Sequence, residues 1–280
     1  MGIIDAIILG IVEGLTEFLP ISSTGHMILA SRLLNLPTTE FLKTFEIVIQ
    51  LGAIAAIVII YWRSLTRDWA VMKRVAAAFI PTAIVGLIVY KGVKAMLGNA
   101  DIVAWSLLIG GLIIIVFEAA YSADCPLGRC GLTRAWAARL GRWGRRLFPA
   151  KPLTEVRGMT YRQAVGIGLC QTLAMIPGVS RSAATVIGGL SLGLDRRAIV
   201  EFSFLLAVPT MLAASALDLL KSAPSFTAVE IDLLVIGFLT AFVTAWLVVK
   251  WFLNYVKRHD FTIFGFYRIL AALAYWFLIR

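Results

Sequence analysis

Six long apolar stretches run through this chain, and they limit its fold more than any other feature. They cover residues 42–62, 75–97, 102–121, 199–220, 231–249 and 261–279. As helices, each is long enough to cross a hydrocarbon core of about 30 Å. Hydrophobic residues make up 60% of the 280 residues and charged residues only 15%, so a soluble fold would expose very large apolar patches. The sequence therefore predicts an all-α polytopic membrane protein with six transmembrane helices.

The termini, cysteines and charges narrow the class further. The first five residues, Met1 to Asp5, lack the basic stretch of a cleaved signal peptide, so we expect the first segment to remain in the mature protein. The three cysteines, Cys125, Cys130 and Cys170, are interpreted as unpaired thiols rather than as a zinc site. The net charge of +10 comes from basic residues between the apolar stretches. That pattern favours membrane orientation and argues against a nucleic acid partner.

Two further apolar segments are broken at their middles by proline and small polar residues. Residues 3–36 are interrupted at Pro20 to His26, and residues 163–194 are interrupted at Pro177 to Ser182. Each arm has only about 11 to 17 residues, or about 16 to 25 Å as helix, which is less than a full crossing. The sequence predicts two re-entrant helical hairpins.

The two hairpins look like copies of one another. Equivalent residues lie at a constant spacing: Pro20 and Pro177, Ser23 and Ser180, Phe45 and Phe202. Three predicted spans follow each hairpin, so the second hairpin enters from the opposite face, as in an inverted repeat. We expect one membrane domain over residues 1–280, with repeat one in 1–121, an insertion in 122–160 and repeat two in 161–280.

Basic residues predict the orientation. They concentrate on one side, at Arg63, Arg67, Lys73, Arg74, the segment 129–157, Arg196, Arg197, Lys250, Lys257 and Arg258. By the positive-inside rule this side is cytoplasmic, so both termini and the mouth of the first hairpin face outward. In the insertion, Trp136 and Trp143 recur at helical spacing opposite several arginines, which predicts an amphipathic helix on the cytoplasmic leaflet.

Glu13 and Glu17 are the first candidates for function, because ionisable residues inside apolar segments are costly. Four residues apart, they share one helical face. Two carboxylates so close repel unless they share a proton, pair with a basic group or hold a cation between them. The alternative is that each carboxylate only bonds to neighbouring helices.

A polar cluster follows directly, formed by Ser22, Ser23, Thr24 and His26. One hydroxyl suffices to cap the next helical arm, so the others remain available. The cluster thus brings a nucleophile and a base within a few residues of each other.

The second hairpin carries a different cluster, which is cationic. Arg181 lies between Ser180 and Ser182, with Gly178 just before them and Thr185 one turn further along. The guanidinium fork matches a phosphate, and helix N-termini add N–H donors. If the hairpins meet, both clusters surround one anionic ligand.

At this point the sequence resembles the undecaprenyl-diphosphatase family, also called the bacitracin-resistance family. The resemblance is carried by Glu13-Gly-Leu-Thr-Glu17-Phe-Leu-Pro-Ile-Ser-Ser-Thr-Gly-His26 and by Pro177-Gly-Val-Ser-Arg-Ser-Ala-Ala-Thr185. It extends to Thr44-Phe-Glu-Ile-Val-Ile-Gln-Leu-Gly52 and Glu201-Phe-Ser-Phe-Leu-Leu-Ala-Val-Pro209. The insertion at 122–160 is longer than the family pattern leads us to expect.

The resemblance implies hydrolysis of undecaprenyl diphosphate to the monophosphate in the bacterial cytoplasmic membrane, in support of peptidoglycan synthesis and bacitracin resistance. It implies a divalent cation, magnesium or else calcium, on Glu13 and Glu17. Ser23 and His26 match the family's proposed catalytic serine and histidine. Ser180, Arg181, Ser182 and Thr185 match its phosphate-binding motif, and we add Ser22, Thr24 and Gly178 to the phosphate site.

Several alternatives stay open at this stage. Ser23 attacks with help from His26, or the same residues orient a water molecule. A lipid flippase would use the same inverted-repeat plan. A lipid phosphatase with two catalytic histidines is disfavoured, because the other histidine, His259, lies at a span end. Membrane lipid and the lipid substrate are the expected partners, and a homodimer is left open.

Overall fold

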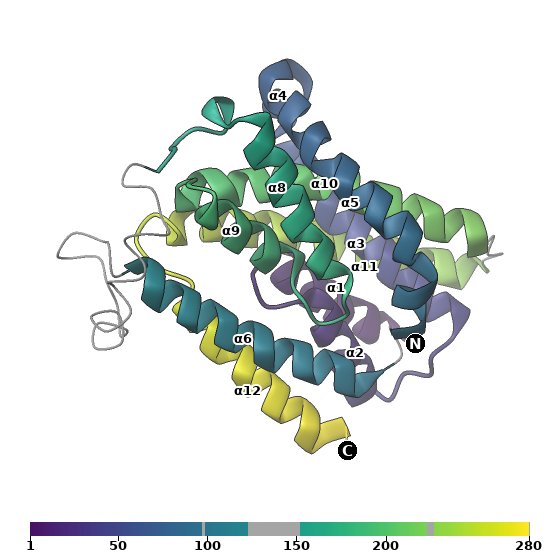
Figure 1. The fold of residues 1–280 in the computed structure, drawn as a ribbon. Coiled ribbons are helices and arrows are strands. Elements are labelled where there is room, and N and C mark those ends of the chain that lie inside the picture. Colours follow the sequence, from purple (N-terminus) through teal and green to yellow (C-terminus); the bar gives the residue numbers. More distant parts are fainter. Residues whose placement is uncertain (97–98, 123–151, 223–226, 280) are drawn as a thin grey trace.

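The computed structural model describes residues 1–96, 99–122, 152–222 and 227–279 (Figure 1). Within these ranges the chain is helical, and the β-structure is limited to one isolated bridge between Leu153 and Leu194. The longer helices are α3 (Glu40–Ile60), α5 (Trp69–Met96), α6 (Ala100–Ser122), α10 (Arg196–Ser222), α11 (Ala228–Tyr255) and α12 (Thr262–Ile279). The shorter ones are α1 (Ile3–Thr16), α2 (Ser23–Leu33), α4 (Trp62–Arg67), α8 (Tyr161–Thr172), α9 (Arg181–Ser191) and the 3-10 turns η1 (Val156–Gly158) and η2 (Leu173–Met175). Most of the predicted amphipathic insertion lies outside the described residues.

Within the described ranges, five helices are long and apolar enough to cross a membrane. They contain the segments Glu40–Ile60, Trp69–Tyr90, Asp101–Tyr121, Arg196–Leu219 and Ala228–Tyr255. The apolar part of α12, Thr262–Phe277, is shorter than these five. Many large apolar side chains on these helices are exposed, such as Ile88, Leu270 and Phe277, which suits lipid rather than water as the surrounding solvent. The prediction of an all-helical, multi-pass membrane protein is confirmed.

The two broken segments fold as pairs of short helices. The first pair is α1 and α2, with 14 and 11 residues, and the second is α8 and α9, with 12 and 11 residues. At about 1.5 Å per residue, none of the four spans a hydrocarbon core. Each break uses one residue with positive φ, Ser22 at 73° and Gly178 at 89°. A Cβ on Gly178 would lie 2.8 Å from the carbonyl oxygen of Val103, so glycine is needed there for both conformation and space.

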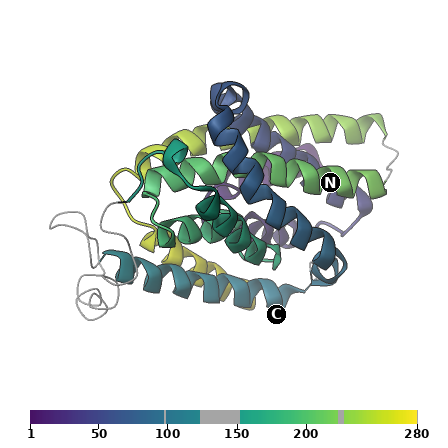
Figure 2. The same cartoon turned by 45° about the horizontal axis from the view of Figure 1, so that its top comes forward.

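The helices pack in a pattern that repeats with the two halves exchanged (Figures 1 and 2). Helix α1 packs on α11, and its counterpart α8 packs on α5. Helix α3 packs on α11, and its counterpart α10 packs on α5, while α3 and α10 also contact each other. The remaining pair, α6 and α12, run side by side along the edge of the molecule in both views. The broken segments thus lie between the long helices.

Glycines allow the short helices to approach their neighbours closely. Gly10 and Gly14 are four residues apart on α1 and face α11, where a Cβ on Gly14 would lie 2.6 Å from the Cβ of Thr244. Gly168 of α8 packs in the same way against the carbonyl of Ala78 on α5. Small residues at this spacing are the usual means of close helix packing in membranes, where the hydrophobic effect does not drive helices together. These contacts fix the arms that carry the breaks.

Candidate active site

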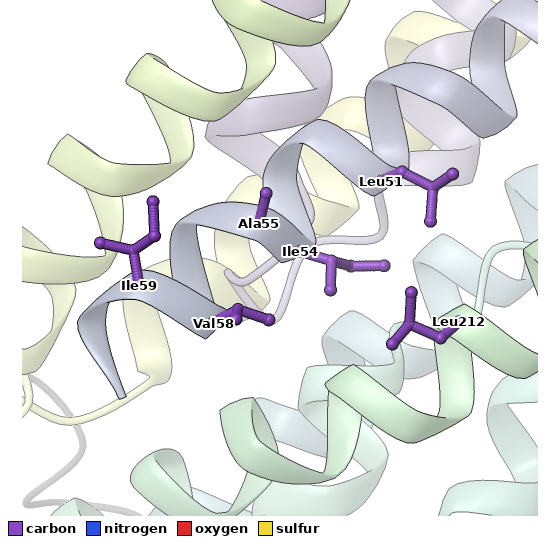
Figure 3. A pocket seen from close by; sticks show the side chains of 6 residues that line it. All are labelled: Leu51, Ile54, Ala55, Val58, Ile59 and Leu212. Carbon is purple, nitrogen blue, oxygen red and sulfur yellow. The ribbon is translucent and has the colours of Figure 1, made fainter. Parts of the chain in front are cut away.

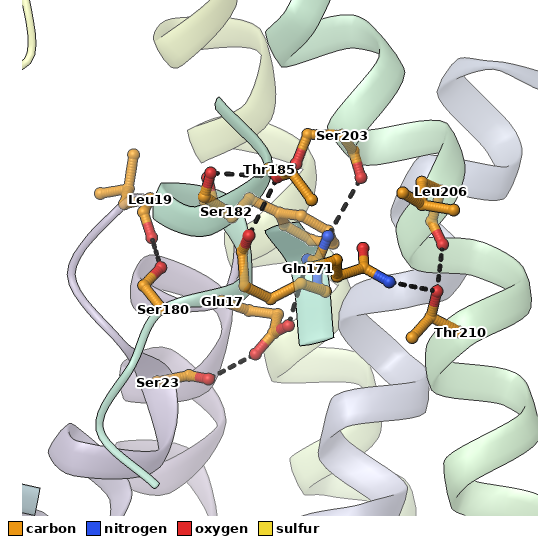
Figure 4. Close-up of polar contacts among 12 residues, drawn as sticks. Glu17, Leu19, Ser23, Gln171, Ser180, Ser182, Thr185, Ser203, Leu206 and Thr210 are labelled. Atoms are coloured by element: carbon orange, nitrogen blue, oxygen red, sulfur yellow. Dashed lines mark hydrogen bonds and ion pairs between the residues drawn. The ribbon is translucent and has the colours of Figure 1, made fainter. Parts of the chain in front are cut away.

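The two breaks contact each other directly. Ser180 Oγ donates a hydrogen bond to the carbonyl of Leu19 at 3.3 Å, and Ser182 Oγ donates to the carbonyl of Phe18 at 2.9 Å (Figure 4). Both serines lie at the N-terminus of α9, and both carbonyls lie in the break after α1. Because these groups are buried, the Ser182 bond also satisfies the carbonyl of Phe18, while the carbonyl of Leu19 accepts a further bond from the Ile21 N–H at 2.8 Å. The polar clusters of the two segments therefore form one site.

Glu17 lies at the centre of this site and has two partners. Its Oε1 pairs with Arg181 Nη2 at 3.3 Å, and its Oε2 accepts a hydrogen bond from Ser23 Oγ at 2.5 Å. The other terminal nitrogen of Arg181 donates to the carbonyl of Ser203 on α10 at 3.0 Å. Glu17 and Arg181 are both buried, so each charge needs the other. The hydroxyl of Ser23, the carboxylate of Glu17 and the guanidinium of Arg181 thus form a continuous chain of polar contacts between the two broken segments.

Two buried polar atoms at this site have no hydrogen-bond partner among the described residues. They are Glu13 Oε1 and Arg181 Nε. The carboxylate of Glu13 interacts electrostatically with Glu17, with Arg181 and with Glu46 of α3. Unpaired buried polar atoms are rare in native structures and call for an explanation. The carboxylate oxygen of Glu13 is suited to bind a metal ion, and the Nε–H of Arg181 is suited to donate to an anion.

Helix N-termini add further positive potential. Ser180 caps α9, with its Oγ accepting from the Ala183 N–H at 3.2 Å, and α2 begins at Ser23. Thr185 donates to the carbonyl of Arg181 and lies 2.6 Å from the hydroxyl of Ser203. The hydroxyls of Ser180, Ser182 and Thr185 thus hold α9 against its neighbours, while the N-termini of both helices point into the same region. This arrangement favours an anionic ligand.

His26 has other partners than the one the sequence suggested. Its Nδ1 lies 2.7 Å from the carbonyl of Ser22, and its Nε2 lies 2.8 Å from the hydroxyl of Tyr267 on α12. Since both ring nitrogens are engaged, the hydrogen-bond acceptor of Ser23 is Glu17 rather than His26. Ser22 itself is buried, and Thr24 is exposed on α2. The sequence cluster therefore separates into groups with different surroundings.

Arg268 is a central residue that the sequence analysis overlooked. It is 1% exposed, and its guanidinium donates to four backbone carbonyls. The acceptors are Pro20 in the first break, Gly178 in the second break, and Ser106 and Leu107 of α6. One side chain from α12 thus ties both breaks together. The signal was present, because an arginine inside a predicted span is costly and marks a site by the same rule as Glu13.

The acidic residues of the site provide few ligands for a divalent cation. Among the described residues, no group of three His, Cys, Asp or Glu side chains is arranged to hold a metal ion. Magnesium, however, commonly takes one or two carboxylates and completes its shell with waters and substrate phosphates. Glu13 fits this role because its Oε1 is free, whereas both oxygens of Glu17 already have partners.

An apolar recess of about 270 Å³ lies between α3 and α10 (Figure 3). It is lined by Leu51, Ile54, Ala55, Val58, Ile59 and Leu212. Ile59 is 59% exposed and Leu212 is 45% exposed, so the recess is open to the outside of the helix bundle. Its walls suit hydrocarbon chains and contribute no polar group to the site.

Fold and site together define a helical, multi-pass membrane protein with a buried centre for an anionic group, assembled from two broken helical segments. The chain belongs to the bacitracin resistance protein BacA family, which it matches over residues 6–274. It is 49% identical to the undecaprenyl-diphosphatase of Aquifex aeolicus over 97% of this chain and 96% of the relative. It is 46% identical to that of Persephonella marina over 96% of both chains, and 44% identical to that of Campylobacter hominis over the full length of both.

Proposed function

We propose that this protein hydrolyses undecaprenyl diphosphate to undecaprenyl phosphate and inorganic phosphate in the bacterial cytoplasmic membrane. The observation that carries the proposal is the connected series Ser23, Glu17 and Arg181 at the contact of the two breaks. It joins a nucleophile, a proton acceptor and a phosphate-binding cation. The full-length relatives named undecaprenyl-diphosphatase support the same activity.

In this mechanism Glu17 takes the proton of Ser23 while the serine oxygen attacks the terminal phosphorus. The bond from that phosphorus to the bridging oxygen breaks, and the lipid monophosphate leaves with the bridging electron pair. A water molecule then hydrolyses the phosphoserine and releases inorganic phosphate. Direct attack by a water molecule held between Ser23 and Glu17 is the close alternative, and it uses the same proton acceptor.

Arg181 holds the transferring phosphoryl group. Its Nε is free to donate, and the N-termini of α2 and α9 supply further N–H donors around the same oxygens. Ser22, Thr24, Gly178, Ser180, Ser182 and Thr185 remain predicted members of the phosphate site. The apolar tail lies between helices, and the recess between α3 and α10 is one surface suited to it.

A divalent cation, magnesium in preference to calcium, would neutralise charge on the diphosphate when bound. Glu13 is the first ligand in this proposal, because its Oε1 is buried without a partner. Glu17 remains a predicted second ligand, although it already pairs with Arg181. The two carboxylates repel each other, and a cation held by Glu13 would reduce this repulsion.

A flippase for polyprenyl phosphate is the competing function. The acidic residues argue against it, because the positions equivalent to Glu13 and Glu17 in the second half are Cys170 and Ala174. A site that only binds and releases a lipid phosphate does not need proton-accepting carboxylates in one of its two halves. Phosphate release in detergent micelles is the test, since micelles offer no membrane to cross. Release from C55 and C15 diphosphates supports the phosphatase, and binding without release would favour the flippase.

We also propose six membrane spans and two re-entrant hairpins, arranged as an inverted repeat. The exchange of packing partners between the halves supports this arrangement, since α1 on α11 mirrors α8 on α5. The proposal counts α12 as the sixth span and puts both termini outside the cytoplasm. The test uses single cysteines at Thr38 and Thr66 in a background without the native cysteines. Intact cells are treated with a thiol reagent that cannot cross the membrane. Labelling at position 38 alone is expected, and labelling at 66 alone would reverse the orientation. A homodimer remains a prediction.

A further inference from the structure

The hydrogen bonds of His26 define its neutral form. Its Nδ1 faces the carbonyl of Ser22 at 2.7 Å. A carbonyl oxygen can only accept, so Nδ1 must carry the proton of the neutral ring. The other nitrogen, Nε2, then presents a lone pair, and the hydroxyl of Tyr267 at 2.8 Å is its donor. A protonated ring would keep both partners, because a tyrosine hydroxyl both donates and accepts.

Tyr267 also restricts the plane of the histidine ring. The two rings are nearly parallel, with an angle of 7° between their planes and 5.5 Å between their centroids. A ring held at both nitrogens and alongside a parallel aromatic ring cannot rotate about its side-chain bonds without losing these contacts. His26 is therefore fixed in orientation as well as in tautomer.

The backbone that carries Tyr267 is itself fixed to the site. The next residue, Arg268, donates to the carbonyl of Pro20 in the first break and to the carbonyl of Gly178 in the second. Pro20 is only two residues from Ser22, the other partner of His26. The turn of α12 that bears Tyr267 is thus held at a set position relative to the start of α2.

We infer that Tyr267 is a positioning residue of the catalytic site, which fixes the ring orientation and tautomer of His26 and acts on the reaction only through that histidine. The inference rests on the proposed function and deepens it by adding His26 to the reaction. The protonated ring, which keeps both partners, stabilises the charge that develops on the leaving lipid phosphate. The plain alternative is that Tyr267, which is 44% exposed, is one of the aromatic residues that membrane proteins carry at the lipid–water interface. Such a residue would tolerate phenylalanine without any effect on His26.

The kinetic test is a double-mutant cycle with Tyr267→Phe and His26→Ala. Tyr267→Phe keeps the aromatic ring and removes only the hydroxyl, so kcat for C55 diphosphate should fall roughly tenfold while KM stays within about twofold. In the His26→Ala background the same change should have no further effect. An equal loss in both backgrounds, a rise in KM alone, or no loss in kcat would overturn the inference.

Tyr275→Phe is the matched control. Tyr275 is a buried tyrosine on the same helix, and its hydroxyl has no hydrogen-bond partner among the described residues. The same chemical change there should leave kcat and KM unaltered. A loss equal to that of Tyr267→Phe would mean that α12 responds to any such substitution, and the inference would fail.

A spectroscopic readout separates this inference from the proposed function. The chain has only two histidines, so ¹⁵N-histidine labelling gives a short set of ring signals. Tyr267→Phe should move the Nε2 resonance of His26 downfield, as expected for a lost hydrogen bond to an unprotonated nitrogen, and leave His259 unchanged. An unchanged Nε2 resonance would refute the pairing even in an active enzyme. A wild-type protein that releases no phosphate would refute the proposed function and leave the spectroscopic result standing.

Discussion

Ser23 donates a 2.5 Å hydrogen bond to Glu17, its partner six positions earlier on the other side of a helix break. The break turns the first residue of α2 back toward the last turn of α1. A serine beside a buried carboxylate, which is itself paired with an arginine, has a proton acceptor already in contact. This relationship assigns the base of the proposed reaction to Glu17.

Replacing that base should stop the chemistry, and it should also lower the thermal midpoint, because the buried Arg181 loses its counter-charge. Glu17→Gln keeps the shape of the side chain but cannot take a proton, so kcat should fall by about 10² to 10⁴. Steady-state phosphate release, with a thermal melt as the check on folding, measures the effect. Glu201→Gln on α10 is the control, since Glu201 forms its ion pair with Arg197 one turn away. Turnover within a few-fold of wild type in Glu17→Gln would return the role to His26.

Arg181→Lys should lose most activity although the charge remains. Arg181 uses one terminal nitrogen for Glu17 and the other for the carbonyl of Ser203, and it keeps Nε for a ligand. A lysine has a single nitrogen, so it cannot donate to all three of these partners as the planar guanidinium does. We expect a fall in kcat/KM of roughly 10² or more, as for loss of a donor to a developing charge. Arg157→Lys, an exposed change in an ion pair with Asp68, is the control. Near-normal kcat/KM would make Arg181 a structural residue only.

The metal proposal predicts a selective effect at Glu13. A chelator should abolish phosphate release, and magnesium should restore it. In Glu13→Gln the magnesium concentration for half-maximal activity should rise at least about tenfold, a loss that even outer-shell partners of metals commonly cause. Titration of activity with magnesium measures this shift. An unaltered titration curve would put the cation on other residues.

Arg268→Met should weaken both the fold and the site. Methionine fills similar space, but it leaves the carbonyls of Pro20 and Gly178 in the two breaks without their donor. The carbonyls of Ser106 and Leu107 lose a second donor and keep their bonds within α6. Each buried carbonyl left unpaired costs about 1 to 3 kcal/mol, so the thermal midpoint should fall clearly and turnover with it. Arg197→Met, at an exposed arginine, should change the midpoint little. A stable and active Arg268→Met protein would contradict the view that α12 ties the breaks together.

The sequence predicted the long helices, the two breaks and the polar clusters for a common physical reason. Long apolar runs are unfavourable in water, and charged residues within them are unfavourable in the membrane. Both features can therefore be recognised from the sequence alone. Arg268 follows the same rule, yet it was missed because its stretch otherwise resembles an ordinary span. The carbonyls of Phe18, Leu19 and Ser203 could not be predicted as partners, because every residue has a carbonyl and only the fold selects which ones are used. Tyr267 lies 241 positions from His26, and no local pattern connects them.

The most direct test of the account is the fate of the terminal phosphate. Purified protein in detergent is given C55 diphosphate labelled on its terminal phosphorus, and both products are quantified for wild type and Glu17→Gln. The account predicts one labelled inorganic phosphate for each C55 monophosphate formed by the wild type, and almost none from the variant. Equal release by both proteins, or no release by the wild type, would contradict it.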